Sequence, residues 1–499
     1  MSSRSASNRS IDFSDSQTGV WNFDNSYARL PDSFFQRVAP TPVTKPEMVV
    51  FNDELADDLG LKPDGRDGFA MASELSGNEV PDDADPIAQA YAGHQFGGFT
   101  MLGDGRAILL GEQITADERR FDIQLKGSGR TRYSRSGDGR AALGPMLREY
   151  LISEALHALG IPTTRSLAVV STGEAVYRER PLPGAILTRV AASHIRVGTF
   201  QYFAGRQDHD GLKALADYTI DRHYPESAEQ NDRYLAFFKA VAFRQADLIA
   251  SWMLVGFVHG VMNTDNVSIC GETIDYGPCA FMDRYDLDTV FSSIDLQGRY
   301  AYGNQPIIGQ WNLGRFAETL LTLIDDDSQQ AIESATEVLK DYEHRYQHSW
   351  MTGMRQKLGI PDADPDDETL IESLSNWMAE NDADMTNTFR ALSDDDTRAE
   401  QIDASEGFQN WHRLWRDRVT RNGRPLRQVR AAMRRHNPAV IPRNHLVESA
   451  LQSAEGGDLT QFETLLRVLS DPYSDQDRDE KFTAAPPVDA PAYRTFCGT

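Results

Sequence analysis

The sequence predicts an α+β protein with two lobes, a mixed α/β lobe followed by a mainly helical one. Short strand-like runs punctuated by glycine dominate from Trp21 to about Phe200, and longer helical patterns take over after about residue 205. The 499 residues also exceed a single domain of roughly 150 residues. We therefore expect a first lobe over 19–200, a second lobe over 201–470, and flexible tails at 1–18 and 471–499.

Composition excludes several partners. The chain has 75 acidic and 50 basic residues and a formal charge of −25, which repels nucleic acid and anionic membranes. The start of the chain lacks the apolar core of a secretory signal, and the most apolar stretch, around Leu248–His259, is too short to cross a bilayer. Three cysteines form neither a disulfide framework nor a zinc spacing. We expect a cytoplasmic monomer with no nucleic-acid or membrane partner.

The elements of the first lobe follow from local patterns. Residues 121–126 alternate apolar and polar side chains, which predicts a strand that directs Lys126 away from the core. Residues 99–110 hold two apolar runs about a Gly103-Asp-Gly105 turn and predict a hairpin. A helix is expected from Gly144-Pro145 to Gly160, because proline at the first turn and glycine at the end are typical boundaries.

The second lobe shows an almost unbroken series of helical patterns. The first, over 234–257, is long and largely apolar, as in a buried central helix. Acidic stretches at 325–327, 362–368 and 394–396 separate some of the later ones as solvated loops. These later patterns cover about 311–324, 329–358, 369–392, 407–436 and 444–470.

A basic, glycine-rich segment stands out against the acidic chain. Glycine lets backbone N–H groups approach an anion, and arginine binds phosphate through paired hydrogen bonds. The composition of this segment predicts polyphosphate binding, with a solvated basic loop as the alternative. Its cations are Lys126, Arg130, Arg132, Arg135 and Arg140, opposed by Asp138, and its glycines are Gly127, Gly129, Gly137 and Gly139.

Lys126 has a candidate partner in Glu149. Lys126 ends the predicted strand, and Glu149 lies on the following predicted helix. Protein kinases use a strand lysine paired with a helix glutamate to position the phosphates of a nucleotide. A lysine–glutamate pair is also common on protein surfaces, where it contributes under about 1 kcal/mol.

A third group of residues has the spacing of a kinase catalytic centre. Asn266 follows His259 by seven residues, and Asp275-Tyr-Gly resembles the metal-binding D-F-G turn. A tight hairpin expected over 267–274 would bring Asn266 and Asp275 together on one hard cation. Val261 occupies the position of the kinase catalytic aspartate and cannot accept a proton, so Asp265 is the candidate base. The alternative is that Asp265 and Asn266 only cap a turn.

Together these motifs resemble the selenoprotein O (YdiU) family of kinase-like protein adenylyltransferases. The resemblance covers roughly residues 20–320, in the family's order, and the carboxy-terminal third is similar mainly in length and helical texture. The matching segments are Trp21-Asn-Phe-Asp-Asn, Tyr91-Ala-Gly-His-Gln-Phe-Gly, Leu125-Lys-Gly-Ser-Gly-Arg, Gly260-Val-Met-Asn-Thr-Asp-Asn, Asp275-Tyr-Gly-Pro, Asn304-Gln-Pro and Trp311-Asn-Leu.

The resemblance implies a protein-kinase-like fold that binds ATP in a flipped orientation and transfers AMP to protein Ser, Thr or Tyr hydroxyls, with pyrophosphate leaving. It further implies that Asp265 is the general base, that Asn266 and Asp275 hold Mg²⁺ or Mn²⁺, and that Glu149 pairs with Lys126. The nucleotide-binding positions it implies are Gly103, Gly105, Arg106, Lys126, Asp138, Gly139, Arg189, Arg196 and Asp275.

The resemblance extends to the end of the chain. Eukaryotic members of the family place selenocysteine third from the end, and Cys497 stands there in this sequence. A thiol on a flexible tail can form a switchable disulfide, and Cys279 is the candidate partner. The alternative is an incidental free cysteine.

Other functions remain open at this point. One is protein UMPylation with UTP and Mn²⁺. A second is phosphoryl transfer with Asp265 as the base, which Val261 disfavours. A third is a silent nucleotide-binding scaffold, which the complete set of Lys126, Asp265, Asn266 and Asp275 disfavours.

Overall fold

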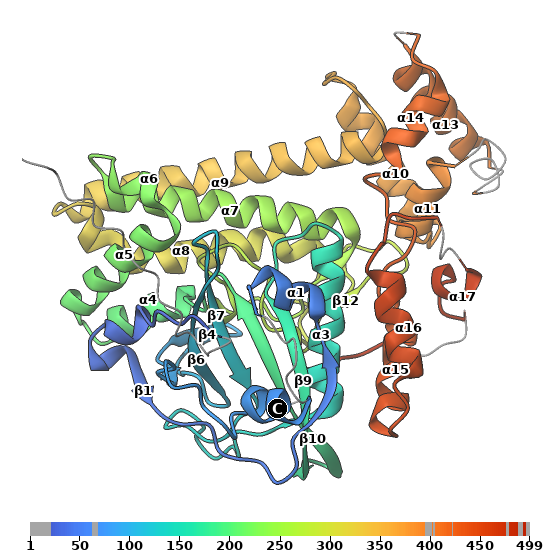
Figure 1. Ribbon diagram of the computed structural model, residues 1–499. Coiled ribbons are helices and arrows are strands. Elements are labelled where there is room, and N and C mark those ends of the chain that lie inside the picture. The colour runs from blue at the N-terminus through green and yellow to red at the C-terminus, as the bar shows by residue number, and fades with distance from the viewer. Residues whose placement is uncertain are drawn as a thin grey trace, which may run out of the picture.

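The computed structural model describes residues 21–61, 68–394, 402, 405–421, 423–475, 479–487 and 493–495. The N-terminal tail predicted over 1–18 and Cys497 lie outside these residues. Within them the chain combines an antiparallel sheet with many helices, so the predicted α+β class is confirmed (Figure 1).

The main sheet is antiparallel at every strand pair. Its order is β1-β3-β6-β7-β10-β9-β2, with β8 paired to β10. Apolar residues on β7, β9 and β10 alternate between the faces, so both faces of the central strands are buried. The strands are β1 Phe35–Arg37, β2 Glu47–Phe51, β3 Ile87–Gln89, β6 Ala107–Ile114, β7 Arg120–Lys126, β8 Ala141–Ala142, β9 Arg165–Tyr177 and β10 Pro181–Ala191.

One helix, α3 (Leu143–Ala158), packs on β9 and β10 through a stripe that includes Leu147, Leu151 and Ala155. The helices α15 (Asn444–Glu455) and α16 (Thr460–Leu469) cover the other side of α3. The sequence grouped these two helices with the second lobe, whereas here the end of the chain returns to the first part of the fold (Figure 1). Residues of α15 thereby line the same cavity as Lys126.

The helical part is built on three long helices that lie side by side, with α7 in contact with both α8 and α9 (Figure 1). Helix α7 is buried along most of its length and ends at Gly256, which adopts the left-handed conformation typical of a helix end. The main helices are α4 Val197–Gly205, α5 His209–His223, α7 Arg233–Val255, α8 Gln305–Ile324, α9 Ser328–Lys357, α10 Asp367–Glu380, α11 Met385–Leu392, α13 Glu406–Thr420 and α14 Leu426–Met433.

Short elements complete the fold. Two of them are small separate sheets, β4 (Ala92–Gln95) with β5 (Gly98–Met101), and β11 (Phe257–Val258) with β12 (Ala280–Phe281). The others are the helical segments η1 Tyr27–Arg29, η2 Asp32–Phe34, α1 Asp53–Asp58, α2 Gly68–Ser76, α6 Pro225–Ala228, η3 Thr264–Asn266, η4 Tyr302–Asn304 and α17 Glu480–Thr483.

Two local predictions are wrong. The runs in 99–110 do not pair with each other: β5 pairs with β4, and β6 pairs with β3 and β7, because the longer apolar β6 completes the main sheet. The segment 267–274 is not a self-paired hairpin either. Ser268 forms a β-bridge with Arg196, directly before α4, and Thr273 forms one with Thr163, shortly after α3. The two sides of the segment therefore pair with other parts of the chain and not with each other.

The described part of the predicted C-terminal tail packs against the protein. Arg390 forms an ion pair with Asp475. Thr495 forms a β-bridge with Ser292, and its hydroxyl donates a hydrogen bond to the carbonyl of Pro278, 2.7 Å away. Thr495 therefore lies beside the Asp275-Tyr-Gly-Pro segment.

Candidate active site

A cavity of about 830 Å³ lies where the sheet meets the helical part. Its walls come from the ends of strands, the start of α3, the loop around η3, the segment after Asp275 and residues 493–495. Lining residues from the sequence-predicted set are Gly105, Arg106, Lys126, Glu149, Arg189, Arg196, Asp265, Asn266 and Asp275. Most of the predicted site residues are thus brought together, although they come from distant parts of the chain.

The predicted Lys126–Glu149 ion pair is present and buried. Lys126 is the last residue of β7, and Glu149 lies in the second turn of α3. The Lys126 Nζ atom lies 2.6 Å from Glu149 Oε2, and the side chains are 8% and 4% exposed. Arg189 also approaches Glu149, at 3.3 Å. Burial of both partners separates this pair from the exposed lysine–glutamate pairs that contribute little.

Asp275 is the centre of the charge arrangement. Its carboxylate lies 3.0 Å from Lys126 Nζ, 2.8 Å from Arg189 Nη1 and 2.9 Å from Arg196 Nη1. Burial acts to raise the pKa of Asp275, but these three cations together hold it well below its ordinary value. Asp275 also has a positive φ of 64°, a left-handed backbone conformation that is uncommon outside glycine. The backbone is held in a disfavoured conformation at the point where three cations meet.

Asp265 lies in the 3₁₀ turn η3 and faces a different environment. Its side chain is buried, its Oδ2 accepts a hydrogen bond from Gln95 Nε2 at 3.4 Å, and its Oδ1 has no hydrogen-bond partner among the described residues. Burial raises the pKa of Asp265 to about 6, while Arg196 opposes the rise. Arg196 donates to the Asp265 backbone carbonyl, 2.8 Å away, and so fixes the turn.

Asn266 and Asp275 supply oxygen donors on the cavity wall. The Asn266 side-chain nitrogen donates to the carbonyl of Val261 at 3.0 Å, which orients the amide and leaves its oxygen to act as a ligand. An amide oxygen and a carboxylate fit Mg²⁺, which takes one or two protein ligands together with phosphates and water. Among the described residues no three His, Cys, Asp or Glu side chains form an all-protein metal cage. The donor set fits a cation held jointly with a nucleotide.

The remaining predicted nucleotide residues divide into two groups. Gly105 and Arg106 lie on the cavity wall, in the connection from β5 to β6. Gly103, in the same connection, packs so tightly on the Tyr133 ring that a Cβ would lie 2.4 Å from it. Gly103 is thus required for the loop contact, and its φ of 138° is also one that favours glycine.

Asp138 and Gly139 lie in the basic loop, outside the cavity lining. Asp138 forms an ion pair with Arg178 at 2.8 Å. Gly139 has a φ of 71° and abuts the backbone of Gly129, where a Cβ would lie 2.2 Å away. The two glycines are joined by a hydrogen bond of 3.0 Å from the Gly129 N–H to the Gly139 carbonyl. These contacts show that Asp138 and Gly139 shape the loop.

The arginines of the basic loop mostly bind protein carbonyls. Arg130 donates to the carbonyl of Gly137, Arg135 to that of Met101, and Arg140 to those of Thr41 and Pro42. Arg132 stacks on the Tyr133 ring. The cations on the cavity wall are instead Arg106, Lys126, Arg148, Arg180, Arg189, Arg196 and Arg494. The sequence identified a phosphate-binding composition, but of these cations only Lys126 belongs to the basic segment, and the six arginines come from elsewhere in the chain.

Several cavity residues escaped the sequence analysis. Arg148, one residue before Glu149, donates to the carbonyl of Cys279 at 2.6 Å and to Glu448 and Tyr493. Its charge on a buried helix stripe is a signal that sequence reading could have used. Tyr91 and Gln95 lie in a segment that matched the family, and Asp104 lies in the predicted Gly103-Asp-Gly105 turn, but no role was predicted for these three residues. No pattern placed residues 493–495 at the cavity that they line.

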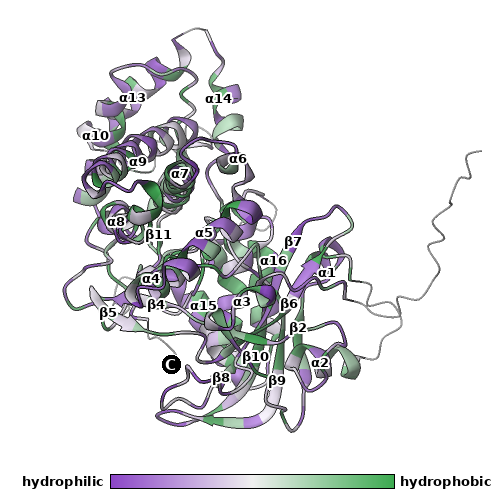
Figure 2. Cartoon of the chain, turned by 90° about the vertical axis from the view of Figure 1, so that its left-hand side faces the viewer, coloured by the Kyte–Doolittle hydropathy of each residue, from purple (hydrophilic) through white to green (hydrophobic). Residues whose placement is uncertain are grey.

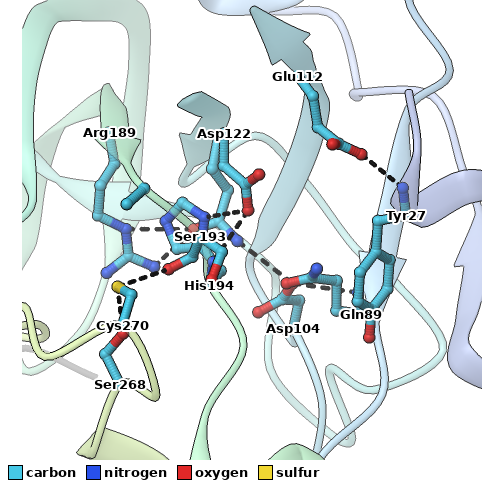
Figure 3. Close-up of polar contacts among 12 residues, drawn as sticks. Tyr27, Gln89, Asp104, Glu112, Asp122, Arg189, Ser193, His194, Ser268 and Cys270 are labelled. Carbon is cyan, nitrogen blue, oxygen red and sulfur yellow. Dashed lines mark hydrogen bonds and ion pairs between the residues drawn. The ribbon is translucent and has the colours of Figure 1, made fainter. Parts of the chain in front are cut away.

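Buried polar contacts join residues next to the site, among them Asp122, His194 and Arg189 (Figure 3). Asp122 on β7 accepts hydrogen bonds from the His194 backbone N–H at 2.9 Å and contacts the His194 ring at 3.1 Å. Asp104 accepts from the Gln89 backbone N–H at 3.1 Å. Burial lowers the pKa of His194 to about 4 although Asp122 opposes the shift. The contacts between Asp122 and His194 fix the segment that runs from Arg189 to Arg196.

The predicted redox pair is only partly described. Cys279 is fully buried, and burial raises the pKa of its thiol to about 12. Cys497 lies outside the described residues, so the disulfide stays a prediction. The described residue nearest to Cys497 in sequence is Thr495, which binds the carbonyl of Pro278, the neighbour of Cys279.

Comparison with known proteins gives the class of this protein. A family model described as "Protein adenylyltransferase SelO" matches residues 19–470. A "Protein nucleotidyltransferase YdiU" of Brevibacillus brevis is 59% identical over 96% of this chain and 98% of its own length. Similar proteins of the same description occur in Geobacillus kaustophilus, at 57% identity over 96% and 99%, and in Alcanivorax borkumensis, at 58% over 96% and 99%.

The chain is therefore an enzyme of the protein nucleotidyltransferase class. It belongs to the SelO family, and the match extends through the C-terminal helices that the sequence motifs alone did not cover. None of the helices in the described ranges is both long and apolar enough to pass through a membrane.

Proposed function

We propose that this protein transfers AMP from ATP to Ser, Thr or Tyr hydroxyls of other proteins and releases pyrophosphate. In this reaction the hydroxyl oxygen attacks the α-phosphorus, the bond to the bridging α–β oxygen breaks, and the hydroxyl proton passes to Asp265. The observation that carries the proposal is the buried cluster of Lys126, Arg189 and Arg196 around Asp275. Three cations on one wall suit the β- and γ-phosphates of a flipped nucleotide.

The contacts of Asp275 support nucleotide exchange at this carboxylate. Lys126, Arg189 and Arg196 all contact Asp275, so phosphate oxygens that reach the same cavity wall can take its place as their partner. When phosphate oxygens engage Lys126, Arg189 and Arg196, the Asp275 carboxylate is released from its ion pairs. It can then bind a cation jointly with Asn266. Mg²⁺ bound there would neutralise charge on the phosphates and on the departing pyrophosphate.

The remaining residues take supporting roles in the proposal. Glu149 orients Lys126 through their buried ion pair, and Asp265 accepts the acceptor proton. Gly103, Gly105 and Arg106 border the nucleotide from the β5–β6 connection, and Asp138 and Gly139 do so from the basic loop. Asp138 and Gly139 do not line the cavity, so their role requires the basic loop to move toward it when ATP binds.

The same arrangement supports a protein-kinase-like fold. A strand lysine paired with a helix glutamate, an Asn266–Asp275 oxygen pair and a long buried helix α7 are the parts that such enzymes use. Val261, at the position of the kinase base, is buried beside the cavity and cannot act in γ-phosphoryl transfer. The predicted monomeric state and cytoplasmic location stay predictions.

Isotope-labelled ATP tests the proposed function. The full chain is incubated with Mg²⁺ and a mixture of synthetic peptides carrying Ser, Thr or Tyr, with ³²P on either the α- or the γ-phosphate. Transfer of the α-label alone, with pyrophosphate as product, is expected. Transfer of the γ-label alone would establish phosphorylation instead, and transfer of neither label would favour a nucleotide-binding scaffold. A parallel reaction with UTP and Mn²⁺ tests UMP transfer, which is favoured if the UTP label is incorporated faster.

A further inference from the structure

The small sheet β4–β5 is fastened directly to the turn that carries Asp265. The His94 backbone N–H donates to Thr264 Oγ1 at 2.7 Å, and the Phe96 backbone N–H donates to Asn263 Oδ1 at 3.0 Å. Thr264 in turn donates to Gln201 on α4 at 2.6 Å. β4 and β5 lie beside α4 in Figure 2. The hairpin, α4 and the η3 turn therefore form one tightly connected unit.

Two glycines allow this close contact. A Cβ on Gly93 would lie 2.3 Å from Asp265 Oδ1, and a Cβ on Gly198 would lie 2.1 Å from the carbonyl of Ala92 and 3.2 Å from the Asp265 Cα. Any side chain at Gly93 would displace the carboxylate. The Asp265 side chain thus occupies space that exists only because the neighbouring strand carries glycine.

Gln95 is held in one direction by the hairpin turn. It is the last residue of β4 and pairs with Gly98. The two turn residues between them, Phe96 and Gly97, have positive φ values of 49° and 87°. Two consecutive positive φ values are typical of the tight two-residue turns that match strand twist. The turn therefore sets where the Gln95 side chain leaves the strand, and that side chain lines the same cavity as Asp265.

The Asp265 carboxylate has few partners that could orient it. Gln95 Nε2 donates to Oδ2 at 3.4 Å, and within the described part of the chain Oδ1 has no hydrogen-bond partner. A carboxylate rotates easily about its terminal torsion, where preferences are broad. Contact with Gly93 on one side and the Gln95 amide on the other restricts this rotation.

We propose that Gln95 is a positioning residue that holds the Asp265 carboxylate in the orientation needed to receive the acceptor proton. The proposal rests on the proposed function, because it requires Asp265 to be the base. Gln95 itself exchanges no proton. With Oδ1 packed against Gly93, the Gln95 amide fixes Oδ2 and thereby sets how the carboxylate is oriented at the cavity wall. A small misplacement of a reacting group can cost about 100-fold in rate.

The test compares Gln95→Leu with wild type in steady-state kinetics of α-label transfer to the peptide mixture. We expect kcat to fall about 10- to 100-fold, with the KM for ATP and the thermal unfolding midpoint unchanged. Gln95→His can place a ring N–H near the position of the lost amide and should recover part of kcat. Thr100→Val, on the adjacent strand β5, serves as the control and should behave as wild type.

A double-mutant cycle separates this proposal from the proposed function. If Gln95 acts through Asp265, Gln95→Leu should cause no further loss in an Asp265→Asn background. An equal fold-loss in both backgrounds would overturn the positioning role. An unchanged kcat in Gln95→Leu, or a fall in kcat that comes with a lower midpoint and a higher KM, would also overturn it. Full activity of Asp265→Asn by itself would instead refute the proposed base.

Discussion

Replacing Asp275 by Asn tests the charge arrangement of the site in two ways. The substitution keeps the side-chain volume and removes the carboxylate that contacts Lys126, Arg189 and Arg196. Breaking a buried ion pair from one side costs about 3–5 kcal/mol of unfolding free energy. Here Lys126 and Arg189 keep Glu149 as a partner, and the Asp275 side chain is 22% exposed. We therefore expect the lower end, about 3 kcal/mol, for the nucleotide-free protein.

The same variant should respond more strongly to nucleotide. In the wild type, phosphates must compete with Asp275 for the three cations, whereas in Asp275→Asn the cations have no such competitor. ATP with EDTA should thus raise the thermal midpoint more in the variant than in the wild type. Metal-dependent label transfer should be lost, because a neutral amide replaces the charged carboxylate that would hold the cation.

Thermal unfolding with and without ATP, together with the α-label assay, measures both effects. Asp247→Asn is a suitable control, because Asp247 pairs with Arg345 at 2.7 Å while both side chains are about two-fifths exposed. Such a pair contributes at most about 1 kcal/mol. A nucleotide-free Asp275→Asn protein as stable as this control, or one that retains metal-dependent transfer, would refute the reasoning.

Three further predictions concern other groups. Burial raises the pKa of Asp104 to about 6 against the opposing field of Arg196, so the wild type loses stability as pH rises from about 4 to 6. Asp104→Asn should therefore match the wild type near pH 4 and be more stable by about 2–3 kcal/mol at pH 7; a difference independent of pH in thermal unfolding contradicts this. Lys126→Ala should lower kcat/KM for ATP at least about 100-fold by removing a phosphate contact, and unchanged turnover would exclude that role. Oxidised protein should yield a Cys279–Cys497 peptide in non-reducing mass spectrometry, and its absence would remove the proposed redox pair.

The parts of the site that the sequence predicted are those set by local periodicity and spacing. Lys126 could be placed at a strand end because its strand alternates with period two, and Glu149 could be placed on a helix by its apolar stripe. Asn266 and Asp275 followed from their spacing to His259. In each case a short stretch of chain contained the whole signal.

The parts that were missed depend on contacts between distant segments. The arginines of the basic loop bind carbonyls of residues such as Thr41 and Met101, which no local pattern could indicate. Arg189 lies within a buried strand, and only the family resemblance, not its local pattern, predicted it as a nucleotide-binding residue. The pairing of β5 with β4 could not be predicted locally, because β6 pairs with β3 and β7, which are distant strands of the main sheet. Gln95 contacts Asp265 because the β4–β5 hairpin packs against the η3 turn, a contact between segments about 170 residues apart that no local pattern shows.

The orientation of the bound nucleotide tests the central claim most directly. A crystal structure of the full chain with Mg²⁺ and an ATP analogue that cannot be cleaved at either phosphoanhydride would show which phosphorus lies next to Asp265. We predict the α-phosphorus at Asp265, with the β- and γ-phosphates on Lys126, Arg189 and Arg196. A γ-phosphorus at Asp265, or an analogue bound away from Lys126, would contradict the account.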